Sequence, residues 1–123
     1  MEKNNSILYL GNSSTENLSG ERALVANGIG VAAVSAPEAA VSYVKNSEVR
    51  VVLLDEAAPG LDLSAVAGSL RVANPWLRII ALISSEDAPR YVDTVLQKPV
   101  DFEALLEAVQ HNLALREAAG SAG

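Results

Sequence analysis

Short apolar runs alternate with amphipathic stretches along the whole chain, a pattern typical of strands that alternate with helices. Residues 49–55 form the most apolar run, Val-Arg-Val-Val-Leu-Leu-Asp, and a Pro-Gly turn signal follows at 59–60. A run this rich in Val and Leu predicts a strand that is buried on both faces. Further strands are predicted at residues 7–10, 29–34, 78–83 and 92–96.

Helical signals lie between the predicted strands. Thr15 is a suitable N-cap, and Pro37 suits the first turn of a helix because its missing N–H loses no partner there. Leu63, Val66 and Leu70 are spaced to share one helical face. Helices are therefore predicted at residues 15–26, from Pro37 onward, at 61–72 and at 102–115.

This alternation predicts an α/β fold in which a doubly wound, five-stranded parallel sheet carries helices on both faces. The fourth helix is predicted to be shortened or missing, because only residues 85–91 precede the fifth strand and an average helix takes about 11 residues. Asp55 ends the most apolar strand. It is therefore expected at the carboxyl edge of the sheet, where proteins of this class bind ligands.

Composition narrows the possible functions. With 123 residues, half of them hydrophobic, the chain suits one compact domain, assigned to residues 1–117, followed by a flexible tail or linker stump at 118–123. A net charge of −6 and nine scattered basic residues argue against nucleic-acid binding, which needs clustered Lys and Arg. There is no cysteine, and no apolar stretch is long enough to cross a bilayer. A soluble, cytoplasmic protein is expected.

Two motifs give the chain a family resemblance. Leu-Leu-Asp at 53–55 is followed by Pro-Gly at 59–60, and Gln-Lys-Pro at 97–99 precedes the closing helix. In these features the chain resembles the receiver domain of bacterial two-component response regulators, over residues 7–115. The resemblance implies a CheY-like, flavodoxin-like sheet with the strand order 2-1-3-4-5.

The resemblance also implies roles for particular residues. Asp55 takes the place of the acid that accepts a phosphoryl group from a kinase histidine, and Lys98 that of the lysine that pairs with this group. The bond to Pro99 is commonly cis in the family, and a cis bond is inexpensive only before proline. The Thr or Ser that binds the phosphoryl oxygen falls on Ile83 in a gapless reading, or on Ser84 after a slip of one residue. The sequence leaves both open.

The metal-binding part of the family pattern is altered. An acidic pair that holds magnesium is replaced by Gly11 and Asn12, and magnesium usually requires carboxylate ligands. The fifth-strand aromatic residue of the family is Val95 here, and Tyr9 is interpreted as a filler at the edge of the core. We therefore expect no metal site and no cofactor, with Mg²⁺ relevant only if Asp55 is still phosphorylated.

Two functions follow from these observations. The first is a pseudo-receiver, a noncatalytic module of a two-component or phosphorelay system that binds proteins, such as a histidine kinase or an attached output domain. The alternative is a working receiver that a histidine kinase phosphorylates on Asp55. An ion pair between Lys98 and Asp55 could also serve only to hold the strand ends together. No Gly-rich phosphate loop supports a flavodoxin-like enzyme. The partner, the oligomeric state and any further domains are left open.

Overall fold

The chain folds around a parallel sheet of five strands in the order β2-β1-β3-β4-β5. The computed structural model describes residues 5–11, 21–46, 49–56, 62–84, 88–98 and 100–122. Its strands are β1 (Asn5–Leu10), β2 (Gly30–Val34), β3 (Val51–Asp55), β4 (Arg78–Ile83) and β5 (Thr94–Gln97). The predicted fold class and strand order are confirmed.

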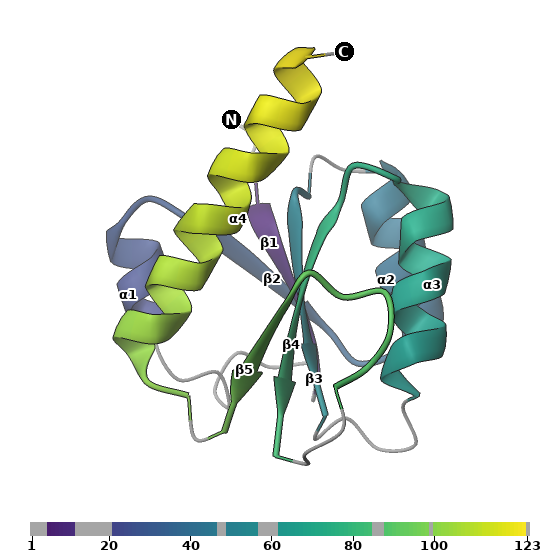
Figure 1. Ribbon diagram of the computed structural model, residues 1–123, viewed down its shortest axis with the longest axis horizontal. Coiled ribbons are helices and arrows are strands. Elements are labelled where there is room, and N and C mark those ends of the chain that lie inside the picture. Colours follow the sequence, from purple (N-terminus) through teal and green to yellow (C-terminus); the bar gives the residue numbers. More distant parts are fainter. Residues whose placement is uncertain are drawn as a thin grey trace.

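Helices cover both faces of the sheet, as Figure 1 shows. They are α1 (Glu21–Ala26), α2 (Pro37–Asn46), α3 (Leu63–Ala73) and α4 (Phe102–Ala122). One core cluster joins the sheet to α2 and α3, and a second joins it to α1 and α4. None of the helices in the described ranges is long and apolar enough to span a membrane.

The central strand β3 is buried along its whole length, as its apolar sequence predicts. Its side chains alternate between the two clusters: Val52 and Leu54 face α2 and α3, whereas Val51 and Leu53 face α1 and α4. Asp55 follows in the same alternation. Its side chain therefore belongs to the side of the sheet that carries α1 and α4.

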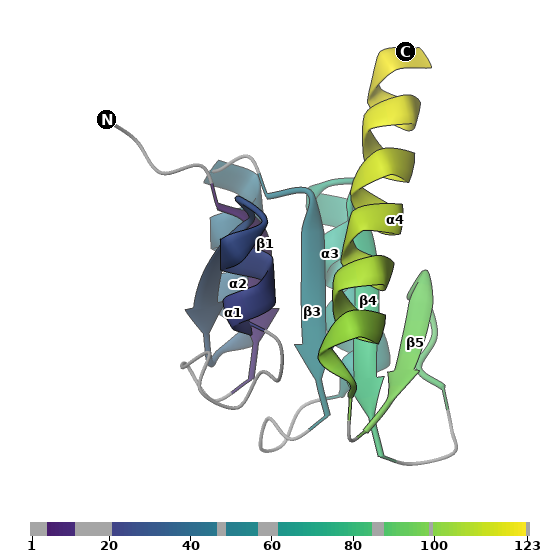
Figure 2. The same cartoon turned by 90° about the vertical axis from the view of Figure 1, so that its left-hand side faces the viewer.

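Several element ends differ from the predictions. The third helix begins at Leu63, because the Asp62 side chain caps it by accepting hydrogen bonds from the N–H groups of Ser64 and Ala65. The fifth strand begins at Thr94, two residues late. The last helix was predicted to end at 115 but continues to Ala122, so helical backbone covers most of the predicted tail, and Figure 2 shows α4 extending past the sheet. The boundary at 117 remains a prediction.

The connection between β4 and β5 confirms the missing fourth helix, since none of its described residues, 84 and 88–93, is helical. Arg71 of α3 holds this segment in place. Its guanidinium donates to the carbonyl of Tyr91 at 2.8 Å and contacts the carboxylate of Asp93 at 2.6 Å. Asp93 in turn accepts a hydrogen bond from the N–H of Ile79 at 2.8 Å. The loop is therefore bound to α3 and β4 by side chains instead of packing as a helix.

Candidate functional site

The site lies at the carboxyl edge of the sheet, where β3 and β5 end. Asp55, the last residue of β3, is only 2% exposed. Lys98 follows β5, and its Nζ donates a hydrogen bond to Oδ1 of Asp55 in a partly buried ion pair. The structure thus brings together the two residues that the sequence singled out from opposite halves of the chain.

A third residue completes the site. The hydroxyl of Tyr9, on β1, donates a hydrogen bond of 2.5 Å to Oδ2 of Asp55. The Tyr9 side chain is fully buried. It was interpreted from the sequence as a filler at the core edge, but it contacts the candidate phosphoacceptor directly. Each oxygen of the Asp55 carboxylate therefore has a donor from within the chain, Lys98 on one side and Tyr9 on the other.

Gly11 is the residue that makes room for the Tyr9 ring. A Cβ atom added at Gly11 would lie 2.6 Å from both Cζ and Oη of Tyr9, a separation that real Cβ atoms essentially never show. The ring of Tyr9 thus fills the space into which a side chain at position 11 would project. A larger residue at position 11 and the observed placement of Tyr9 exclude each other.

These residues do not fit a bound magnesium ion. Gly11 offers no side-chain ligand, and Oδ2 of Asp55 is already hydrogen-bonded to Tyr9. Within the described ranges no group of three or more His, Cys, Asp or Glu side chains is placed to hold a metal. Asn12, the other altered position of the family's acidic pair, lies outside the described residues.

Burial and Asp55 both keep the Tyr9 phenol protonated. Loss of solvation on burial raises the pKa of Tyr9 well above its usual value, and the hydrogen bond to Asp55 and the negative charge of that carboxylate raise it further. In the unfolded chain a tyrosine ionises near pH 10, at about its reference value. The folded protein should therefore hold a proton that the unfolded chain releases above that pH.

This difference predicts a loss of stability in alkali. Above about pH 10 the free energy of unfolding should fall by up to about 1.4 kcal/mol per pH unit, because the unfolded state binds fewer protons. Tyr9→Phe should remove this part of the slope, at a cost of about 1 kcal/mol at neutral pH for the lost hydrogen bond. Urea unfolding at a series of pH values measures both effects. Tyr91→Phe is the control, since Tyr91 is exposed; equal alkaline slopes for the two variants would contradict the assignment.

Ile83 and Ser84 belong to opposite sides of the sheet. Ile83 is 1% exposed and packs in the cluster that faces α2 and α3, whereas Leu82 packs in the cluster on the Asp55 side. Ser84 comes next, is exposed, and donates its backbone N–H to Oε1 of Glu56 at 2.8 Å. Alternation along the strand thus assigns Ser84 to the side of the sheet that carries Asp55. Its pairing with a phosphoryl group stays a prediction.

The other positions compared with the family pattern are Val95, Pro99 and the turn at 59–60. Val95 of β5 is half-buried and packs against the cluster under α2 and α3. Pro99, the expected cis proline, lies outside the described residues, as does the Pro-Gly turn at 59–60.

Tyr9 is the site residue that sequence reasoning missed. The available signal was an aromatic residue in an otherwise aliphatic strand, two positions before a glycine and so on the same strand face.

Sequence comparisons assign no family to the chain, but structural comparison defines its fold. No protein-family model matches the sequence, and curated proteins likewise provide no match. A CheY-like response regulator receiver domain protein from Methanospirillum hungatei is 17% identical, with a TM-score of 0.80 and coverage of 95% of this chain and 99% of that chain. The chain therefore has the fold of a response regulator receiver domain.

Two further solved structures share this fold. The receiver domain of a sensor histidine kinase from Pseudomonas aeruginosa, described with a magnesium ion coordinated in its active site cleft, is 21% identical. Its TM-score is 0.76, over 91% of this chain and 99% of that chain. An adenylate cyclase structure from Rhodopirellula baltica is 19% identical, with a TM-score of 0.80 over 95% and 93%. At these identities the likeness concerns the fold alone.

Proposed function

We propose that this chain is a noncatalytic receiver-like module of two-component signalling, which binds a protein partner without metal-dependent phosphorylation of Asp55. The expected partners are those of receiver domains in general, a histidine kinase or an attached output domain. One observation carries the proposal. The Asp55 carboxylate is buried and held on both oxygens by Tyr9 and Lys98, and the Tyr9 ring fills the space beside Gly11.

The chemistry of phosphoryl transfer explains why this arrangement opposes phosphorylation. A carboxylate oxygen must reach the phosphorus atom in line with the leaving group, while a metal ion balances the charge on the transferring group. Here Oδ2 of Asp55 accepts a hydrogen bond from a fully buried phenol, and position 11 supplies no metal ligand. Attack from Oδ2 would require the Tyr9 ring to leave a closely packed core, which is energetically costly.

A working phosphoacceptor is the second candidate. The contact between Lys98 and Asp55 favours it, because a lysine in this position can also pair with a phosphoryl group on Asp55. This function would need Mg²⁺, a histidine kinase and movement of Tyr9. In the proposed module the same ion pair holds the ends of β3 and β5 together.

Amide NMR titration separates the two functions. Spectra of the full chain would be recorded with Mg²⁺ and then with beryllofluoride, a mimic of a phosphoryl group on a carboxylate. For the noncatalytic module we expect no shifts centred on Asp55, Ser84 and Lys98. Shifts at these residues that vanish in Asp55→Asn would overturn the proposal and establish a phosphoacceptor.

A variant that carries an acidic pair at positions 11 and 12 tests whether Tyr9 and Gly11 prevent the binding of Mg²⁺. Gly11→Asp combined with Asn12→Asp supplies the acidic pair, but the new side chain at position 11 meets the Tyr9 ring. Adding Tyr9→Val removes that ring. The triple variant should bind Mg²⁺ at least about tenfold more tightly than the double variant, equivalent to about 1.4 kcal/mol. Equal Mg²⁺ affinities in calorimetry would show that Tyr9 does not block the metal site.

A further inference from the structure

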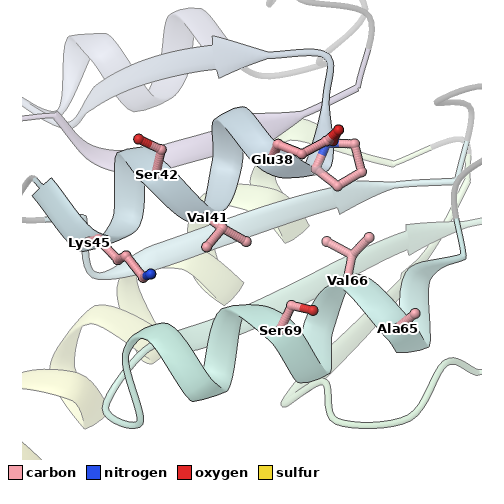
Figure 3. A pocket seen from close by; sticks show the side chains of 8 residues that line it. Glu38, Val41, Ser42, Lys45, Ala65, Val66 and Ser69 are labelled. Carbon is pink, nitrogen blue, oxygen red and sulfur yellow. The ribbon is translucent and has the colours of Figure 1, made fainter.

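Helices α2 and α3 lie side by side on one face of the sheet, and an open groove of about 640 Å³ runs between them (Figure 3). We call it the α2–α3 groove. It is lined by Pro37, Glu38, Val41, Ser42 and Lys45 of α2 and by Ala65, Val66 and Ser69 of α3. The groove is on the opposite side of the sheet from the Asp55 side chain.

The floor and walls of the groove suit a packed helix. Val41 and Val66 provide apolar contacts, and the small side chains Ser42, Ala65 and Ser69 allow another backbone to approach closely. The helical spacing of Ala65 and Ser69 continues to Val72, whose side chain is 85% exposed. The polar groups of the lining are spread along both helices and do not converge on one point, as they would in a small-molecule pocket (Figure 3).

Two opposite charges mark the ends of the α2 side of the groove. Glu38 is in the first turn of α2 and Lys45 is in its last turn, seven residues or about 10 Å apart along the helix axis. Both are exposed. Neither side chain forms an ion pair with any residue that the structure describes. Figure 3 shows them at opposite ends of the groove, with Val41 and Ser42 between them.

This arrangement is complementary to itself under a two-fold rotation. If the α2 helices of two chains lie antiparallel, Glu38 of each meets Lys45 of the other, and the axis passes midway between them, beside Val41 and Ser42. Contacts that are reciprocal in this way define an isologous interface. A parallel arrangement would bring like charges together. The α2 helix of each copy would then occupy the α2–α3 groove of the other.

We propose that the α2–α3 groove binds the α2 helix of a second copy of this chain, forming a two-fold symmetric dimer. The antiparallel arrangement also brings Pro37 of the second copy toward the exposed Val72. This inference does not depend on the proposed function, because it involves neither Asp55 nor its partners Tyr9 and Lys98.

Charge reversal gives a sharp test by sedimentation equilibrium at low ionic strength, where exposed pairs are least screened. Glu38→Lys and Lys45→Glu each turn two attractive contacts into two repulsive ones. Each variant should weaken the dimer by about 10- to 50-fold, given the modest strength of exposed pairs. Combining both changes in one chain restores the pairs with reversed sign, so this double variant should dimerise like the wild type.

Mixing the two single variants provides a second rescue. A chain with Glu38→Lys and a chain with Lys45→Glu attract each other at both ends of α2, so an equimolar mixture should dimerise more strongly than either variant alone. The control is Glu103→Lys, which makes the same change in the first turn of α4. It should leave the dimer unchanged, and circular dichroism checks that α2 stays helical in each variant.

Four results would overturn the proposal. The first three are a wild-type chain that stays monomeric at high concentration, a dimer that is insensitive to both single reversals, and a failure of the double variant to restore association. A dimer disrupted equally by Glu103→Lys would also refute it, since only net charge would then matter. None of these results affects the NMR experiment with Mg²⁺ and beryllofluoride, so the two proposals fail separately.

Discussion

Lys98→Met should lower the free energy of unfolding by about 3 kcal/mol, because it leaves the buried carboxylate of Asp55 without its cation. The Asp55 side chain is only 3% accessible, whereas that of Lys98 is 25% accessible. The two members of the pair should therefore respond differently to substitution. A carboxylate that cannot reach water suffers most from the loss of its partner.

Substitution of Asp55, the other member of the pair, should lower the free energy of unfolding by less. In Asp55→Asn the new amide oxygen can still accept the Tyr9 hydroxyl, and the partly exposed Lys98 can turn toward water, so we expect a loss of about 1 kcal/mol. Combining Asp55→Asn with Lys98→Met should recover part of the larger loss, because no unpaired charge remains. Urea unfolding of the four proteins measures this coupling. If Lys98→Met cost no more than Asp55→Asn, the carboxylate would have to be solvated in the native state.

Gly11→Ala should cost about 3 kcal/mol, since overpacking of a rigid core adds to the loss of a hydrogen bond. The new methyl group would lie 2.6 Å from Cζ and Oη of Tyr9. The ring has little room to withdraw, because it is fully buried and its hydroxyl is bound to Asp55. In a Tyr9→Leu background the opposing atoms are absent, and Gly11→Ala should be nearly neutral.

Gly68→Ala is the matched control for Gly11→Ala. The nearest atoms to a Cβ at Gly68 are in the Tyr91 ring, at 3.7 and 3.9 Å, which is ordinary contact. Gly68 lies within α3, so the same chemical change there should raise stability by up to about 1 kcal/mol through helix propensity. Opposite signs at the two glycines would confirm that the effect at Gly11 is steric. Equal costs in the wild-type and Tyr9→Leu backgrounds would refute it.

Periodicity and element length predicted most of the fold, because both act locally. The alternation of apolar runs predicted the positions of the strands, and the short interval between the fourth and fifth strands correctly predicted a missing helix. Element ends were less predictable, since they depend on single contacts. The cap by Asp62 set the start of α3, and no comparable stop signal ended α4 at the predicted residue.

The site was only partly predictable for a different reason. Asp55 and Lys98 stand at strand ends, so topology alone brings them to the same edge of the sheet. The hydrogen bond of Tyr9 joins residues 46 positions apart and depends on how far a side chain reaches along its strand. Likewise, the sides of the sheet to which Ile83 and Ser84 belong could be assigned only from the observed division of the core into two clusters.

The mutual exclusion of Tyr9 and a side chain at position 11 also restricts the order in which this site could evolve. A lineage that acquired an acid at position 11 while Tyr9 was present would pass through a poorly folded intermediate, which selection tends to remove. Replacement of Tyr9 first would open the path, at the cost of one hydrogen bond to Asp55. Epistasis between Tyr9 of β1 and position 11, just after that strand, thus protects the present site from gaining an acid there.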